Sequence, residues 1–161
     1  MSGFKWVFVL SILTIVINQS FAQNLFSERL RRIHCAKKSI FLEKGIFHNG
    51  GTKRLSKLKA IRHSFSRQTG HERIVFDFTT SEIPRIYGHL SSVNKKLHVD
   101  FFDTELFGNI SSFGSSKYVD DVKFFPLSEE MLSVELNFKE KVTFDIFCLK
   151  SPGRLVIDIK Q

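Results

Sequence analysis

The sequence predicts an all-β fold, a β-sandwich of two similar sheets that arises from an internal duplication. Three observations support this fold class. Beyond residue 57 apolar residues recur at every second position, Phe, Val and Ile are abundant, and the same pattern returns after about sixty residues. A basic N-terminal extension precedes the sandwich, and part of it has the spacing of a short helix.

The alternation is clearest in segments 74–78, 97–101, 134–138 and 155–159, where apolar residues occupy every second position. A strand directs successive side chains to opposite faces, so each segment would bury one face. Gly, Pro, Ser and Asn concentrate between these segments, as in 68–70 and 151–153, and favour turns. We therefore expect strands joined by short connections.

The second run of strands repeats the first in the same order. Four segments match: 58–62 with 119–123 at a spacing of sixty-one residues, 74–78 with 134–138 at sixty, 83–90 with 142–149 at fifty-nine, and 97–100 with 155–158 at fifty-eight. Each one-residue change falls in a connection, where changes of length are tolerated. The pattern predicts two halves of four strands each, which complete each other's core.

The N-terminus has the order of a secretory signal peptide. Lys5 precedes an apolar run over residues 6–17, and Ser20 and Ala22 follow it. The run is shorter than the roughly 20 residues of a spanning helix but fits a signal h-region. We expect cleavage after Ala22 and a periplasmic location; an uncleaved N-terminal anchor is the alternative. The predicted organisation is a signal peptide over 1–22, a basic extension over 23–56 and a sandwich domain over 57–161.

The positive charge is concentrated in one segment. Residues 23–62 hold eleven Lys and Arg against two Glu, whereas residues 63–161 are slightly acidic. Such a segment favours anionic partners: lipid head groups, acidic glycans or the carboxylates of peptidoglycan. Nucleic acid matches the charge, but an exported protein seldom meets it, so we expect none. Leu25, Phe26, Leu30 and Ile33 have helical spacing and predict a short amphipathic helix that could contact a membrane surface; a solvated tail is the alternative.

The two cysteines, Cys35 and Cys148, leave two interpretations open. In an oxidising compartment they could form a disulfide that closes a very long loop. Alternatively, the alternation over 142–148 places Cys148 on the buried face of a strand as a small apolar residue.

Segments 58–62, 71–78 and 96–101, with their counterparts 119–123, 132–138 and 154–159, resemble the AMIN domain. The resemblance covers about residues 57–160. It implies a periplasmic β-sandwich, typically appended to cell-wall amidases or type IV pilus secretins, that binds peptidoglycan and localises its partner. Two departures from the family's pattern limit how far its properties are expected to apply to this chain. Phe102-Asp103-Thr104 stands where small turn residues are expected, and Ser133 replaces the Arg73 of the first half. A glycan site is therefore expected around the first half.

The aspartates at alternate strand positions allow two interpretations. They keep a sheet face hydrated, or Asp100 or Asp158 pairs with Arg73 or Arg154 in a polar groove that contacts saccharide hydroxyls or peptide carboxylates. Tyr87 could add an aromatic platform, although an edge-packed Tyr is the common outcome. The candidate ligand-binding residues are Arg73, Tyr87, Asp100, Arg154 and Asp158.

No catalytic pattern emerges from the sequence. The six histidines form neither His-x-x-x-His nor His-Glu-x-x-His, and Gly-x-Ser-x-Gly, phosphate-loop and Cys-x-x-Cys motifs are absent. His71-Glu72 is interpreted as a solvated turn pair. We expect no enzyme, no cofactor and no metal.

Two functions follow from these features. The first is a module that binds peptidoglycan or another anionic envelope glycan, or localises a complex with a cell-wall hydrolase or a secretion or pilus component. The second is an assembly scaffold that binds a protein partner or an anionic membrane surface.

Overall fold

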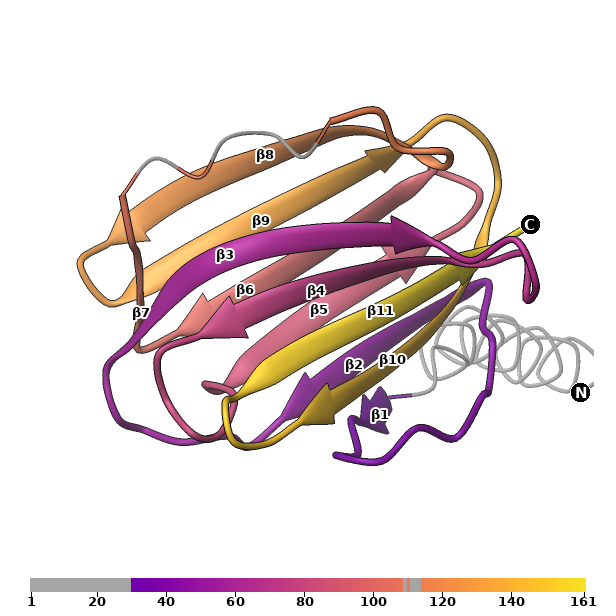
Figure 1. Ribbon diagram of the computed structural model, residues 1–161. Coiled ribbons are helices and arrows are strands. Elements are labelled where there is room, and N and C mark those ends of the chain that lie inside the picture. Colours follow the sequence, from indigo (N-terminus) through magenta and orange to yellow (C-terminus); the bar gives the residue numbers. More distant parts are fainter. Residues whose placement is uncertain (1–29, 109, 111–113) are drawn as a thin grey trace, which may run out of the picture.

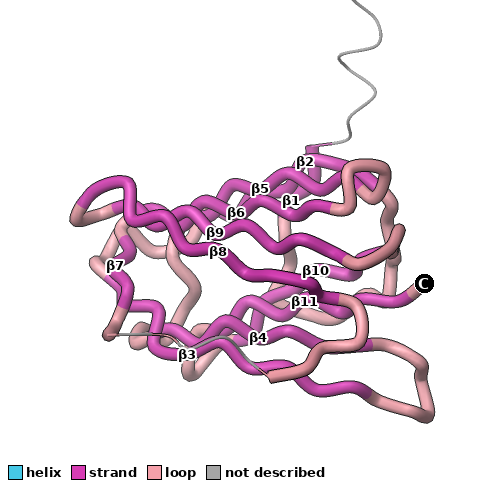
Figure 2. Tube along the Cα trace, turned by 90° about the horizontal axis from the view of Figure 1, so that it is seen from above, coloured by secondary structure: helices cyan, strands magenta, loops and turns pink. Residues whose placement is uncertain are grey.

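The computed structural model describes residues 30–108, 110 and 114–161. Two mixed β-sheets pack face to face (Figures 1 and 2). The strands are β1 (Leu30–Arg32), β2 (Lys44–Asn49), β3 (Ser56–Phe65), β4 (Glu72–Phe78), β5 (Ile86–Ser91), β6 (Lys96–Phe102), β7 (Thr104–Leu106), β8 (Val119–Ser128), β9 (Met131–Phe138), β10 (Thr143–Leu149) and β11 (Arg154–Lys160). Sheet A has the order β1-β2-β5-β6-β9-β8, and sheet B the order β10-β11-β4-β3-β7. The predicted all-β sandwich is confirmed.

The described residues contain no helix of the length and apolar character needed to cross a bilayer. The expected signal peptide, residues 1–22, lies outside the described residues.

The strand order confirms the internal duplication. Sheet A contains the run β5-β6-β9-β8, and sheet B contains β10-β11-β4-β3. Exchanging each strand for its counterpart in the other half, β3 for β8, β4 for β9, β5 for β10 and β6 for β11, converts one run into the other. Each half thus contributes one hairpin to each sheet, and both sheets are built from both halves.

The register repeats as well. Phe76 pairs with Leu155 across β4 and β11, and the equivalent Leu136 pairs with Leu97 across β9 and β6. An irregularity at the start of β3, after Leu58, recurs at the start of β8. The matched sequence segments therefore reflect matched structure down to single residue pairs.

One predicted match is corrected by one residue. The sequence repeat predicts that 83–90 matches 142–149 at a spacing of fifty-nine residues. In the structure Leu90 pairs with Leu97, and Cys148 pairs with Leu155, which is the counterpart of Leu97. The structural spacing over β5 and β10 is therefore fifty-eight, and Leu90 corresponds to Cys148. A slip of one residue turns every side chain to the opposite face, so the buried faces decide the alignment.

The boundary of the sandwich also moves towards the N-terminus. The predicted extension, residues 23–56, contributes two strands of sheet A, because β1 pairs with β2 and β2 pairs with β5. The predicted helix is wrong where the structure describes it, since residues 30–32 form a strand; its earlier part lies outside the described residues. The Phe47 ring of β2 lies directly over Gly88 of β5, where any Cβ would overlap it. This close contact joins the extension to the duplicated core.

The core lies between the sheets and is rich in phenylalanine. The rings of Phe76 and Phe78 contact Phe101 across the sandwich, and Phe138 contacts Phe144. All five side chains are at least 96% buried. The many phenylalanines are used here for packing, as expected of a residue type that is mostly internal.

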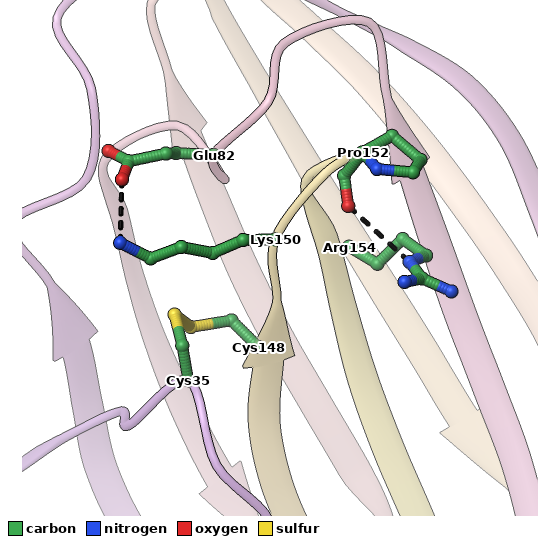
Figure 3. Close-up of a disulfide and its surroundings, with 6 residues drawn as sticks. All are labelled: Cys35, Glu82, Cys148, Lys150, Pro152 and Arg154. Carbon is green, nitrogen blue, oxygen red and sulfur yellow. Dashed lines mark hydrogen bonds and ion pairs between the residues drawn. A yellow bond between two sulfur atoms is a disulfide. The ribbon is translucent and has the colours of Figure 1, made fainter.

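A connector, residues 33–43, joins β1 to β2 and closes one open side of the sandwich. A disulfide links Cys35 of the connector to Cys148 of β10 (Figure 3). Leu42 exchanges two backbone hydrogen bonds with Phe144, and the Cys148 N–H donates to the His34 carbonyl. Both interpretations of Cys148 therefore hold, because it is fully buried and also bonded.

A buried carboxylate binds the end of the segment that connects the two halves. Glu72, at the start of β4, is fully buried and accepts hydrogen bonds from the Ser116 hydroxyl at 2.8 Å and the Tyr118 N–H at 2.9 Å. Its other oxygen lies 3.1 Å from His63 Nδ1. The interpretation of His71-Glu72 as a solvated turn pair is wrong for Glu72, which is a polar anchor inside the fold.

Candidate binding surfaces

The five predicted ligand-binding residues lie on two different surfaces. Arg73, Arg154 and Asp158 alternate with buried residues of β4 and β11, so they belong to the outer face of sheet B. Tyr87 and Asp100 pair with each other across β5 and β6 on the outer face of sheet A. The structure therefore does not bring the five residues into one groove.

On sheet B the predicted pairing of Asp158 with Arg73 is present. Arg73 donates from Nε to Oδ1 at 2.6 Å and from a terminal nitrogen to Oδ2 at 2.8 Å. Lys37 of the connector reaches the same carboxylate, with Nζ 2.8 Å from Oδ2. The Asp158 side chain is fully buried, whereas those of Arg73 and Lys37 are about one third exposed. Asp158 thus does not serve to hydrate the sheet face.

The charge of Asp158 is balanced within the fold. Burial by itself raises the pKa of Asp158, but the hydrogen bonds and charges of Arg73 and Lys37 outweigh this and hold the pKa below its usual value. The two cations also lie over the Phe147 ring, at 5.7 and 5.9 Å from its centroid. An ion pair with this degree of satisfaction stabilises the packing of the connector on sheet B and leaves little capacity to bind a ligand.

Arg154 does not join this cluster. Its Nε donates to the Pro152 carbonyl over 3.4 Å (Figure 3), and its cross-strand neighbour Asp77 pairs instead with Arg62. Beside it, Lys150 and Glu82 form an ion pair of 2.6 Å near the disulfide. Of the two arginines named as alternatives, Arg73 pairs with Asp158, whereas the described contact of Arg154 is with the Pro152 carbonyl.

The outer face of sheet A carries a row of polar and aromatic side chains. The strand register aligns His48 of β2, Tyr87 of β5, Asp100 of β6 and Ser133 of β9. The Tyr87 residue is 42% exposed. This row, with His98 beside it, is called the sheet A row below.

A hydrogen-bonded group lies within the sheet A row. His98 Nε2 is 3.0 Å from Asp100 Oδ1 and 3.2 Å from Ser133 Oγ. The three residue types are those of a hydrolytic triad, but both contacts use the same ring nitrogen and Ser133 is only 2% exposed. A relay needs the two ring nitrogens to face different partners, so these three side chains do not form a Ser-His-Asp relay.

Sequence reasoning missed several residues of these surfaces. Lys37 was assigned to a solvated or helical extension, and His48 came from a strand that the sequence did not reveal. His98 could have been found, because residues two apart on a strand share a face and it precedes Asp100 by two positions.

Within residues 30–108, 110 and 114–161, no cluster of three or more His, Cys, Asp or Glu side chains has an arrangement that could hold a metal ion. Comparisons of this chain with protein-family models, with curated proteins and with solved structures find no match.

Proposed function

We propose that this chain is an exported, non-catalytic module of the bacterial cell envelope that binds peptidoglycan through the sheet A row and localises an envelope complex. The observation that carries the proposal is the alignment of His48, Tyr87, Asp100 and Ser133 across four neighbouring strands on the outer face of sheet A, with Tyr87 42% exposed. The resemblance to the AMIN domain supports this class of ligand. A disulfide between Cys35 and Cys148 fits an oxidising compartment such as the periplasm.

The chemistry of the row suits a glycan strand or its peptide stems. Asp100 can accept hydrogen bonds from saccharide hydroxyls and amides, and the His98 ring can donate or accept, while the buried Ser133 hydroxyl contacts the His98 ring from within the sheet. The Tyr87 ring offers a rigid amphipathic surface for a sugar face. A shallow surface of this kind favours an extended polymer that makes many modest contacts.

A scaffold function is the second candidate. Phe125 is 43% and Leu127 59% exposed, and both lie at the end of β8, at the edge of sheet A. Exposed apolar side chains at a sheet edge favour a protein partner. The basic connector would add attraction to an anionic surface, which salt would screen.

Co-sedimentation with purified sacculi tests the proposal. Tyr87→Ala and His98→Ala should each weaken binding by roughly threefold to tenfold, since loss of one aromatic or hydrogen-bonding contact costs on the order of 1 kcal/mol. Phe107→Ala is the matched control, because Phe107 is 56% exposed but follows β7 of sheet B. It should bind as the parent protein does.

The salt dependence separates the two functions. Binding through the sheet A row should retain a fraction at about 0.5 M salt, where exposed charges are strongly screened. If binding disappears with moderate salt and Tyr87→Ala behaves like the parent, the sheet A row does not bind glycan and the scaffold function replaces it.

A further inference from the structure

The duplication gives the sheet A row a counterpart on the outer face of sheet B. On sheet A the register of β5, β6, β9 and β8 aligns Tyr87, Asp100, Ser133 and Phe125. On sheet B the corresponding strands β10, β11, β4 and β3 align, in the same order, Asp145, Asp158, Arg73 and Ser64. Asp100 and Asp158 are therefore equivalent residues, each at the second position of its row.

On sheet B, the aspartate of the row holds an ammonium group that comes from another segment of the chain. Lys37 of the connector places its Nζ 2.8 Å from Asp158 Oδ2 and 5.9 Å from the centroid of the Phe147 ring. The connector is far from β11 in the sequence, so it approaches this face as a separate peptide segment. The structure thus contains one intramolecular example of how a face of this fold receives a peptide that carries a lysine.

Asp100 occupies the same position but has fewer partners. Asp158 also accepts two hydrogen bonds from Arg73, whereas the counterpart of Arg73 is Ser133, whose hydroxyl contacts the His98 ring. Among the described residues Asp100 has one hydrogen-bond partner, the His98 ring, with Nε2 3.0 Å from Oδ1. No described Lys or Arg side chain forms an ion pair with it. The Asp100 carboxylate therefore keeps acceptor capacity that Asp158 uses within the fold.

The Asp100 carboxylate is accessible from solvent, unlike its counterpart. The Asp100 side chain is 17% exposed, whereas that of Asp158 is fully buried. Its neighbours on the same face are more open, since the Tyr87 residue is 42% and the His98 side chain 40% exposed. An ammonium group bound at Asp100 would lie next to Tyr87, its cross-strand neighbour, and a cation beside an aromatic ring gains further attraction.

An acceptor of this kind distinguishes the two parts of peptidoglycan. An N-acetylated glycan strand offers hydroxyl and amide donors but no ammonium group. A stem peptide that contains a diamino acid carries a free ammonium group wherever that residue is not cross-linked. A hydrogen bond between two charged groups is roughly twice as strong as one between neutral groups, so a carboxylate without a cationic partner favours the stem peptide.

We propose that the sheet A row binds the stem peptides of peptidoglycan by their free ammonium groups, which Asp100 receives as Asp158 receives that of Lys37. The inference rests on the function proposed above and names the part of the polymer that is recognised, the stem peptide and not the glycan strand. Lys37 is accordingly an internal analogue of the ligand.

Co-sedimentation with sacculi whose amines have been acetylated, compared with untreated sacculi, tests the proposal. Acetylation removes the positive charges of the stem peptides and leaves their carboxylates, so the sacculi become more negative. Because the chain is basic, with a formal net charge of +8, non-specific attraction should then increase. Recognition of the ammonium group predicts the opposite result, a loss of affinity of about tenfold, as expected when one charge-assisted hydrogen bond is removed.

A capped Ala-Lys-Ala peptide and its counterpart with an acetylated lysine side chain isolate this contact. In titrations of the isotope-labelled protein, the backbone amide resonances of Tyr87, His98 and Asp100 should shift saturably with the unmodified peptide. Its dissociation constant should be on the order of millimolar, as expected for so few contacts, and the acetylated peptide should bind about tenfold more weakly.

Two variants complete the peptide experiment. Asp100→Asn should weaken the unmodified peptide by about tenfold and leave the acetylated peptide unchanged, because only the charged partner is lost. Asp121→Asn is the matched control, since it removes the same charge from β8 of the same sheet, where the side chain is 50% exposed. It should bind both peptides as the parent protein does.

Equal binding of the two peptides, or no saturable shift with either, overturns the proposal. This comparison uses the parent protein, so it decides even if Asp100→Asn does not fold. Acetylated sacculi that bind as well as untreated ones, or better, also overturn it, but they leave recognition of the glycan strand and thus the proposed function standing. If neither kind of sacculus binds, the peptidoglycan function itself fails, and recognition of the stem peptide fails with it.

Discussion

Removal of the Cys35–Cys148 disulfide should destabilise the fold by a predictable amount. The two cysteines are 113 residues apart, so the bond closes most of the described chain into one loop. The chain-entropy relation gives about 4.8 kcal/mol at 25 °C for a loop of this length. Measured effects are often smaller because the reduced, unfolded chain keeps some structure, so we expect a loss of about 2–5 kcal/mol for the variant with Cys35→Ala and Cys148→Ala.

Urea unfolding, followed by far-ultraviolet circular dichroism, measures this loss. The oxidised protein, the reduced protein and the double variant should be compared, and the latter two should unfold at similarly reduced urea concentrations. Native-state hydrogen exchange adds a local readout, since the Leu42 and Phe144 amides join the connector to β10 and should lose protection first. If all three forms have the same free energy of unfolding within about 0.5 kcal/mol, the closed loop does not constrain the unfolded chain and the reasoning fails.

Two further predictions concern the core and the buried carboxylates. Phe76→Ala and Leu136→Ala remove equivalent, fully buried side chains and should cost about 3–5 and 2–5 kcal/mol of unfolding free energy; unchanged melting midpoints would refute the register. Burial raises the pKa of Asp145, so its ionisation costs stability as pH rises above the ordinary value of 3.8, and Asp145→Asn should gain stability relative to the parent between pH 3 and pH 7 in urea titrations. A gain that is equal at both pH values would show that Asp145 does not titrate abnormally. The pH dependence of stability due to Asp158 has the opposite sign. Its lowered pKa provides stability at neutral pH, and this stability is lost only as pH falls through the pKa of Asp158 in the folded protein.

The duplicated strands could be predicted because their alternation is strong and local. Segments such as 74–78 and 134–138 bury one face and expose the other, and this pattern does not depend on the rest of the chain. The strands of the extension could not be found in this way. β1 has only three residues and forms because β2 lies beside it, and β2 contains a glycine that weakens its pattern.

The candidate site was predicted only in part, because it also depends on a segment whose structure the local sequence pattern does not reveal. The pairing of Arg73 with Asp158 follows from residue chemistry and was anticipated. Its burial depends on the connector, which lies over β10 and places Lys37 on the same carboxylate. Sequence alone does not report which of two equivalent faces another segment covers. Thus Asp100 and Asp158 occupy equivalent positions, yet one belongs to an open face and the other is enclosed.

The exchange of hairpins between the two halves has a consequence for how such a chain can be divided. Strands β3 to β6 by themselves would form two separate hairpins, because their extended pairing is with strands of the other half. Two copies of one half, related by a twofold axis, could supply all of these pairings to each other. The fold therefore has the geometry of a symmetric dimer whose subunits are joined end to end, and the N-terminal segments β1, β2 and the connector make its two faces unequal.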